Sequence, residues 1–271
     1  MKKIVLSNDQ INNIISLYNS GLSCNKIAIE LNYSASFIQR ILYSANIKLR
    51  AYHQLNRKHF VDENYFNEID CEEKAYFLGF LFADGNVNKH SNQVVLKLNS
   101  RDKEILIRLN KLISNECLIF EYGDNSELRF SSKNIKDNLI KYGCIPNKSL
   151  KLKFPNIDNK YVRHFIRGYF DGDGSIVRYR NDFVVIIVST EDFCNGINIY
   201  FSGVIDHPKY ATNRGNNITC TIGYKGNRKV LKFLEMIYMD STIYLNRKYK
   251  KYLELVDWCN SVDKKRPGRY V

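Results

Sequence analysis

Apolar and polar positions divide residues 71–245 into two similar halves, 71–150 and 151–245. Each half opens with an apolar segment, at 75–83 and near 160–172, that predicts a buried helix and ends in an acid followed by a glycine. Strand-like alternation, a helix, a hairpin and a last helix follow in both. This internal repeat predicts an α+β fold of tandem αββαββα units, with two antiparallel sheets related by a pseudo-twofold axis.

The strands and helices within each half can be placed from the same pattern. Val94, Leu96 and Leu98 alternate with polar neighbours and predict a half-buried strand. Other segments of the first half are a helix over 101–113, a hairpin over 118–132 and a helix over 134–143. Those of the second half are a strand over 183–189, a helix over 190–202, a hairpin over 207–224 and a helix over 226–238.

Residues 1–50 have a different pattern, which predicts a small all-α domain. Ser7 and Gln10 form a capping box, Gly21 ends the first helix, and two more short helices follow. The stretch "LYNSGLSCNKIAIELNYSASFIQRIL" resembles the resolvase-type helix-turn-helix family. In that motif the third helix enters the major groove. The outward residues that would contact DNA are Ser36, Gln39 and Arg40, with Ser34 near a phosphate. The alternative is a three-helix module that binds another protein.

The remaining segments connect or follow these domains. Residues 51–70 are polar without a sustained period and predict a linker. Residues 246–271 begin with the basic stretch "NRKYKKYLEL", which predicts an amphipathic helix followed by a disordered tail.

Charge indicates a polyanionic partner. The chain carries 41 Lys and Arg against 28 Asp and Glu, a formal net charge of +13, so nucleic acid is the first candidate. No apolar stretch is long enough to span a bilayer, and the N-terminus lacks a signal-peptide apolar region. Seven cysteines stand singly, with no C-x-x-C pair, and predict reduced thiols rather than a zinc site. We therefore expect a protein of the cytoplasm, bacterial or phage-type, or of an organelle, and not a secreted or membrane protein.

The two acid-ended helices carry the candidate chemistry. Small residues lie four apart in both, Gly79 and Ala83 in the first and Gly168 and Gly172 in the second, which favours close helix packing. Parallel pairing would bring Asp84 and Asp173 together, where they repel each other and face two helix C-termini. A divalent cation, Mg²⁺ or Mn²⁺, relieves both problems, and the carbonyls of Ala83 and Gly172 are further candidate ligands. The alternative is two C-capping acids in unrelated turns.

The segments "FLGFLFADG" (77–85) and "IRGYFDGDG" (166–174) resemble the two motifs of a LAGLIDADG homing endonuclease. The resemblance covers about 70–255, and the first motif has Phe82 where the pattern often has an earlier Asp. It implies a monomer whose two sheets form a saddle over the major groove of a long double-stranded DNA target. It also implies that Asp84 and Asp173 bind the metal that hydrolyses one phosphodiester on each strand. Two alternatives stay open, a DNA-binding regulator that does not cut and an intron maturase.

Lysines and strand residues complete the expected site. Lys133 and Lys225 follow the hairpins of the two halves, about 50 residues past each acid, and are candidates for stabilising charge in the reaction. The alternative is an exposed lysine in a first helical turn. Strand alternation gives candidate DNA contacts, which could equally be a solvated strand face: Gln93, Lys97, Arg129, Arg178, Arg180, Asn217 and Thr219.

Overall fold

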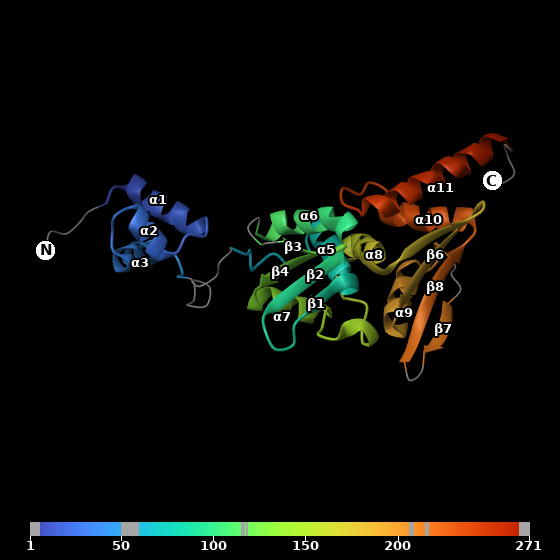
Figure 1. Ribbon diagram of the computed structural model, residues 1–271, viewed down its shortest axis with the longest axis horizontal. Coiled ribbons are helices and arrows are strands. Elements are labelled where there is room, and N and C mark those ends of the chain that lie inside the picture. The colour runs from blue at the N-terminus through green and yellow to red at the C-terminus, as the bar shows by residue number, and fades with distance from the viewer. Residues whose placement is uncertain are drawn as a thin grey trace. The chain divides into compact units, whose positions relative to one another are not determined.

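The computed structural model describes residues 6–49, 60–114, 117, 119–205, 209–214 and 217–265 (Figure 1). The chain divides into two compact units, residues 1–60 and residues 61–271. The expected linker over 51–70 is too long, because residues 61–70 belong to the second unit. Tyr65, Phe66 and Ile69 are buried in its core. Residues 50–59 lie outside the described part of the chain.

The first unit is all-α, as predicted. Its helices are α1 (Asn8–Asn19), α2 (Cys24–Glu30) and α3 (Ala35–Ser44). Ser7 caps α1 through the predicted capping box, because its hydroxyl accepts from Gln10 N while the Gln10 side chain accepts from Ser7 N. The core is formed by the inward faces of the three helices, with Ile14, Ile27, Ile38 and Leu42 fully buried.

The second unit contains the predicted tandem repeat, and the α+β fold class is confirmed. The first half consists of α5 (Glu72–Asp84), β1 (Gly85–Val87), β2 (Gln93–Asn99), a 3₁₀ turn (Ser100–Asp102), α6 (Lys103–Ile113), β3 (Ile119–Tyr122), β4 (Asn125–Ser131) and α7 (Lys133–Tyr142). The second half consists of α8 (Asn159–Asp173), β5 (Ser175–Tyr179), β6 (Asp182–Ser189), α9 (Glu191–Tyr200), β7 (Lys209–Arg214), β8 (Asn217–Lys225) and α10 (Asn227–Tyr238). Both halves therefore have the order αββαββα.

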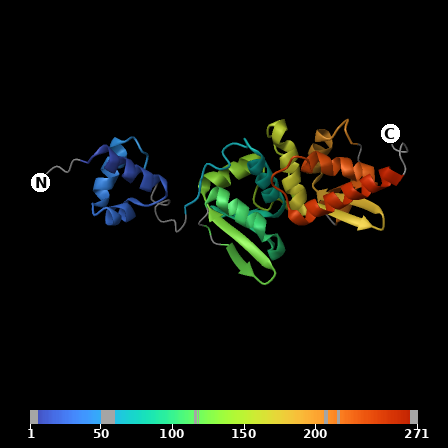
Figure 2. The ribbon, with the colours of Figure 1, turned by 90° about the horizontal axis from the view of Figure 1, so that it is seen from above.

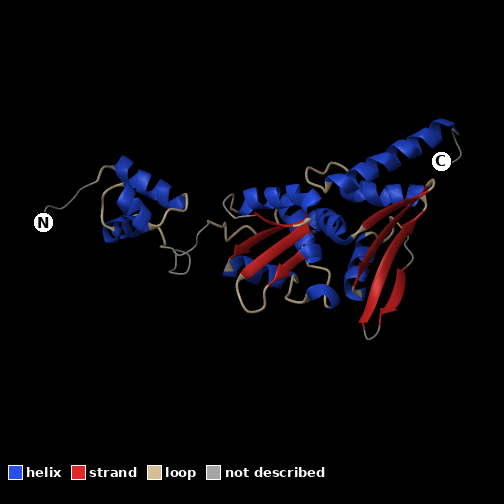
Figure 3. Cartoon of the chain, in the orientation of Figure 1, coloured by secondary structure: helices blue, strands red, loops and turns tan. Residues whose placement is uncertain are grey.

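The two sheets share one topology. Each is a four-stranded antiparallel sheet, ordered β1-β2-β4-β3 in the first half and β5-β6-β8-β7 in the second. The helix pair α5 and α8 lies between them, as Figures 1 and 3 show. This arrangement places the C-terminal ends of the two central helices between the sheets.

Strand alternation determines which sheet face is buried. On β2 the predicted residues Val94, Leu96 and Leu98 point into the core, and Leu96 is paired with the equally buried Leu128 of β4. On β6 the buried set is Phe183, Val185 and Ile187. The opposite face of each sheet, here called its outer face, carries the residues in between.

A final helix, α11 (Asn246–Lys265), packs along α10, as the view from above shows (Figure 2). The helix expected at 246 is confirmed, and Leu255 and Cys259 are buried on its inner side. A short 3₁₀ turn (Lys148–Leu150), which the sequence did not predict, lies in the connector between the halves. No helix in the described part of the chain is long and apolar enough to cross a bilayer.

Candidate active site

Helices α5 and α8 pack backbone to backbone. A Cβ added to Gly79 would collide with the carbonyl oxygen of Phe165, and one added to Gly168 would collide with that of Tyr76. Further along, a Cβ on Gly172 would strike the side chain of Ala83. Contacts therefore advance together along both helices, which makes the pair parallel. The predicted interface of Gly79, Ala83, Gly168 and Gly172 is present.

This packing delivers two carboxylates to one place. Asp84 and Asp173 are the last residues of α5 and α8. A Cβ on Gly172 would lie 3.0 Å from Asp84 Oδ2, so the acid of one helix rests against the end of the other. The glycines after the acids, Gly85 and Gly174, have φ of −73° and −75°. They are needed for space, because a side chain on Gly174 would overlap Phe170.

The acids have shifted proton affinities. Crowding by protein atoms and the nearby Asp173 carboxylate raise the pKa of Asp84 to about 6, against the pull of Lys248, Lys148 and Arg247. Desolvation likewise raises the pKa of Asp173, and a hydrogen bond from Tyr169 with the charges of Lys148 and Lys248 opposes it. Two carboxylates that disfavour each other's ionised form are a site at which bound positive charge is stabilised.

Two lysines outside the predicted set hold the helix ends. Lys148 Nζ donates to the carbonyl of Gly85, just past α5. Lys248 Nζ donates to carbonyls at the end of α8, among them Asp171 at 2.8 Å and Gly172 at 3.3 Å. Their exposed fractions are only 9% and 3%, and burial lowers the pKa of Lys248 to about 8. Each ammonium thus stabilises a helix C-terminus beside one acid.

The sequence does contain a weak signal for these lysines. Each lies within two residues of an asparagine beyond the last helix of its half: Lys148 in "PNKS" (146–149), and Lys248 in "LNRK" (245–248), in the first turn of α11. Lys133 and Lys225, the predicted pair, are elsewhere. Lys133 is exposed on the first turn of α7 and forms an ion pair with Asp137. Lys225 is exposed at the end of β8 and corresponds in sheet register to Ser131 of β4, two residues before Lys133.

Asp171 is another functional candidate that the sequence pattern did not indicate. It is fully buried, and its carboxylate accepts hydrogen bonds from Tyr76 OH (2.9 Å), Tyr238 OH and Leu245 N (2.7 Å). These contacts join α5, α8 and α10 to the segment that leads into Lys248. Phe82 occupies the matching place in α5 and packs edge-on against Phe165 instead.

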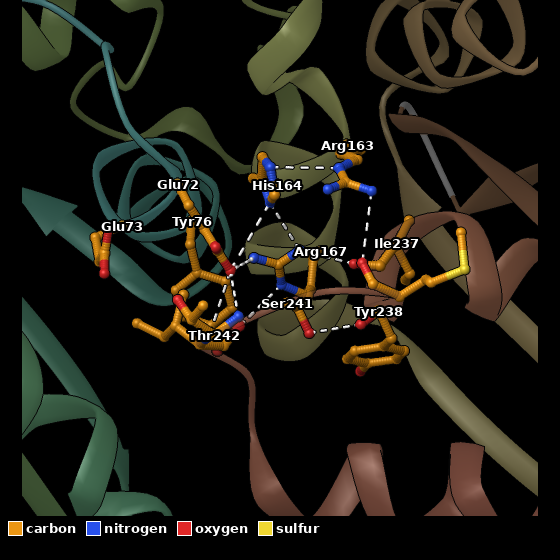
Figure 4. A network of polar contacts seen from close by, with 12 residues as sticks. Glu72, Glu73, Tyr76, Arg163, His164, Arg167, Ile237, Tyr238, Ser241 and Thr242 are labelled. Atoms are coloured by element: carbon orange, nitrogen blue, oxygen red, sulfur yellow. Dashed lines mark hydrogen bonds and ion pairs between the residues drawn. The ribbon is translucent and has the colours of Figure 1, made fainter.

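Arg167 forms the neighbouring polar network between the two halves (Figure 4). It is fully buried, yet its guanidinium donates to Ile243 O (2.9 Å), Ile237 O (2.7 Å) and Glu72 Oε1 (2.6 Å). Because its donors are largely paired, this charge can stay inside the protein. The network fixes α8 against α5 and against the turn after α10.

A pocket of about 340 Å³ opens beside Asp173. Its lining is Phe82, Ala83, Lys148, Ser149, Leu150, Leu152, Tyr169, Asp173, Val188, Ser189 and Thr219. It therefore joins the acid and Lys148 to the second sheet.

The donor set fits a hard divalent cation. Mg²⁺ is bound by one or two carboxylates and keeps several waters, and two adjacent carboxylates are what Asp84 and Asp173 provide. Within the described residues no third Asp, Glu, His or Cys joins them. Of the two predicted carbonyl ligands, that of Gly172 is already hydrogen-bonded to Lys248.

The predicted DNA contacts of the first sheet lie together. Gln93, Lys97 and Arg129 are all on its outer face, where Lys97 is paired with Glu127. Arg129 forms an ion pair with Glu127 and lies 5.0 Å from the centre of the Phe120 ring. Val95, Phe120 and Tyr122 share this face, so the sheet presents mainly polar, charged and aromatic groups outward.

The second sheet departs from the prediction at two arginines. Arg178 has the phase of the buried Ile176, and its guanidinium lies over the Phe183 ring on the core side of the sheet edge. Arg180 is in the turn after β5, with φ of +55°, and not on a strand face. Thr219 is on the outer face and lines the pocket. Asn217 begins β8, but its side chain lies outside the described part of the structure.

In the first unit the predicted contacts are on α3. Ser36, Gln39 and Arg40 are exposed, and Arg40 lies over the Phe37 ring. Ser34 is the N-cap, accepting from Phe37 N at 3.2 Å. The Ser34 hydroxyl therefore already caps the N-terminus of α3.

Comparison with known proteins links the second half to a family. The LAGLIDADG-like domain model matches residues 160–252, which confirms the resemblance seen in the motif at 166–174. Three relatives come from Methanocaldococcus jannaschii. The replication factor C small subunit is 27% identical over 203 residues (70% of this chain, 10% of that protein). The probable translation initiation factor IF-2 is 32% identical over 132 residues (46% and 11%). The uncharacterized protein MJ0314 is 27% identical over 151 residues (52% and 54%). The chain spans roughly a tenth of the first two.

Solved structures of similar shape have little sequence identity to this chain. The meganuclease I-SmaMI bound to uncleaveable DNA is 12% identical, covering 70% of this chain and 90% of that one, with a TM-score of 0.46. The homing endonuclease I-LtrWI bound to target DNA is 13% identical, covering 74% of this chain and 92% of that one, with a TM-score of 0.46. WhiA from Thermatoga maritima is 17% identical, covering 72% of this chain and 64% of that one, with a TM-score of 0.45. Since each TM-score is below 0.5, the family link rests on residues 160–252.

Proposed function

Because residues 160–252 match the LAGLIDADG-like domain model and the same order of elements precedes them, we propose that this protein is a site-specific double-strand DNA endonuclease. The placement of Asp84 and Asp173 side by side, at the ends of two parallel helices between two sheets, carries the proposal. A buried core does not require two acids at helix C-termini, which the helix dipole disfavours by about 0.3–1 kcal/mol each. A divalent cation that bridges to a phosphate is bound through one or two carboxylates of this kind.

The acids and lysines of the site would have different roles in hydrolysis. Asp84 and Asp173 would hold Mg²⁺ or Mn²⁺, which when bound neutralises charge on the phosphate and activates water. Lys148 and Lys248 add positive charge beside the acids and fix both helix ends. Asp171 positions Lys248 through its hydrogen bond to Leu245 N. Rigid placement of this kind lets charges act on a phosphate without reorganising.

Long duplex DNA is the substrate that the surfaces favour. The net charge of +13 suits a polyanion, and the two outer sheet faces flank the acids on both sides. The exposed residues of α3 provide a second contact with DNA, so that the target extends past the cut. One chain supplies both acids, and the protein would therefore act as a monomer.

A DNA-binding regulator that does not cut is the second candidate. The observation in its favour is Lys248, whose ammonium is hydrogen-bonded to the Gly172 carbonyl, one of the expected cation ligands. A positive charge at that position competes with a cation for the same oxygen.

Cleavage of random-sequence duplex DNA in Mg²⁺, with sequencing of the cut ends, tests the proposal. Wild-type protein is expected to cut one recurring sequence, while Asp84→Asn and Asp173→Asn bind it with little change and leave it intact. Asp137→Asn, which changes an exposed acid on α7, is the matched control and should cut normally. Sequence-specific binding without cutting by wild type would favour the regulator. Double-strand cutting by the Asp84→Asn, Asp173→Asn double variant would refute the site.

A further inference from the structure

The outer faces of the two sheets are chemically different. On the second sheet a row of β-branched aliphatic side chains faces outward, made of Val177, Val184, Ile186 and Val188. Val177 and Val188 are 48% and 45% exposed. On β2, the strand that matches β6, the outward residues are Gln93, Val95, Lys97 and Asn99, so polar side chains predominate there. Sheets whose other face forms the core do not need exposed aliphatic groups, so a row of them marks a contact surface.

Neighbouring residues make the row protrude. Ile186 lies between Ser175 of β5 and Gly223 of β8, which are both small. Val177 and Val184 are direct cross-strand partners. The aliphatic groups therefore stand above their surroundings and can reach into a groove.

The row begins at the candidate active site. Val188 lines the same pocket as Asp173 and Lys148, and the row continues along β6 to Val184 and across to Val177. A duplex with a phosphate at Asp173 would therefore place the adjoining groove over these residues. Lys225, exposed opposite Val184, gives the same face a cation for the phosphate backbone.

We propose that the outer face of the second sheet reads thymine 5-methyl groups in the major groove, while the first sheet reads its half by hydrogen bonds. This inference rests on the proposed function and adds the chemical class of the target. Thymine is the base that offers a methyl group in the major groove, and apolar side chains recognise it by contact. Arg129, Lys97 and Gln93 suit guanine and adenine edges. The target is thus asymmetric, with thymines concentrated in one half.

The full chain is used to select the sequences it binds from random duplex DNA. Variants of each sheet then show which half of the target that sheet reads. Ile186→Ala should relax the base preferences of one half, and Arg129→Ala those of the other. Ile107→Ala is the matched control, because Ile107 is an exposed isoleucine on α6, outside both sheets. It should leave both halves unchanged.

Modified bases then test the contact itself. Deoxyuridine in place of thymidine removes only the methyl group, and each contacted methyl that is removed should weaken binding about fourfold. Ile186→Ala should lose this sensitivity in the half it affects. In the other half deoxyuridine should have little effect, and 7-deazaguanine, which lacks N7, should weaken binding.

The outcomes separate the inference from the function on which it rests. Sequence-specific binding that is indifferent to deoxyuridine in the Ile186-dependent half overturns the thymine assignment and leaves the endonuclease intact. Failure to select any duplex sequence overturns both. If Ile186→Ala changes self-association in light scattering but not base preference, the row is a protein contact and the inference is wrong.

Discussion

His164 shows how one buried residue is kept neutral by its surroundings. It is 7% exposed, and both ring nitrogens face guanidinium groups, Arg167 Nη1 at 2.9 Å from Nδ1 and Arg163 Nε at 3.3 Å from Nε2. Burial and these two cations lower its pKa to about 4, although Glu72 opposes the shift. A protonated His164 would add a third cation to a network that contains one nearby carboxylate.

This shift predicts a loss of stability in acid. The unfolded chain binds a proton at His164 below about pH 6.5, whereas the folded protein does so only near its pKa of about 4. The free energy of unfolding should therefore fall as the pH drops through that window, by up to about 3 kcal/mol from this residue. Urea unfolding at several pH values measures the slope.

Asparagine at the same position isolates the effect. His164→Asn keeps an acceptor for Arg167 but cannot take up a proton, so its stability should fall less between about pH 6.5 and 4. His90→Asn, a change in an exposed loop, is the control and should follow wild type. An unchanged slope in His164→Asn would show that the acid sensitivity comes from other groups.

Among the elements, α5 and α8 depend on glycine for their spacing. Ala in place of Gly168 would force a methyl group into the Tyr76 carbonyl, where only backbone could move. We expect Gly168→Ala to lower the free energy of unfolding by about 3 kcal/mol, the upper end for overpacking. Gly223→Ala is the control, since the nearest atom to its new methyl would be Val185 O at 3.9 Å. Equal denaturation midpoints for the two variants would contradict the close packing.

The C-terminal end of α8 depends on one lysine. Lys248→Met removes the ammonium that serves several carbonyls, and we expect it to lower the free energy of unfolding by about 3 kcal/mol. Lys148→Met should cost less, because Lys148 donates to the single carbonyl of Gly85. Lys250→Met, at an exposed position of α11, serves as the control in denaturant unfolding. A stability of Lys248→Met equal to that of the control would exclude the capping role.

Elements with strong local patterns were the predictable ones. Buried helices, alternating strands and the meeting of Asp84 with Asp173 follow from periodicity and from small residues four apart. Lys148 and Lys248 donate to backbone carbonyls, and a sequence does not show which carbonyls a side chain far along the chain will reach. Distance along the chain from each acid indicates Lys133 and Lys225 instead, although these two do not occupy equivalent positions, since Lys225 corresponds in sheet register to Ser131. Arg178 points to the core side of β5, but β5 is an edge strand, so a long side chain on that side can still reach solvent. The alternation of residues alone does not reveal which strand forms the edge.

At the scale of the whole molecule, two units with separate cores suggest separate tasks. Residues 1–60 contain eight Lys and Arg against two Asp and Glu, a net charge of +6. Deleting them should weaken DNA binding and make it less dependent on salt. The logarithmic salt slope should become shallower by about 0.9 for each DNA phosphate that the truncated chain no longer neutralises. Cutting at saturating protein should persist.

Binding titrations at several salt concentrations, together with single-turnover cleavage, measure both effects of this truncation. The full chain, titrated under the same conditions, is the reference for affinity, salt slope and cleavage rate. Unchanged affinity in the truncated chain would argue against a DNA contact by α3.

The glycine-to-backbone contact between α5 and α8 has a consequence for evolution. It fixes the distance between the acids by main-chain geometry alone, while the outward residues of the sheets take no part in that contact. In the proposed endonuclease, substitutions on those strands can therefore accumulate and redirect the protein to new DNA sequences without disturbing the paired acids. Sequence preference and the geometry of the acids would then change independently of each other.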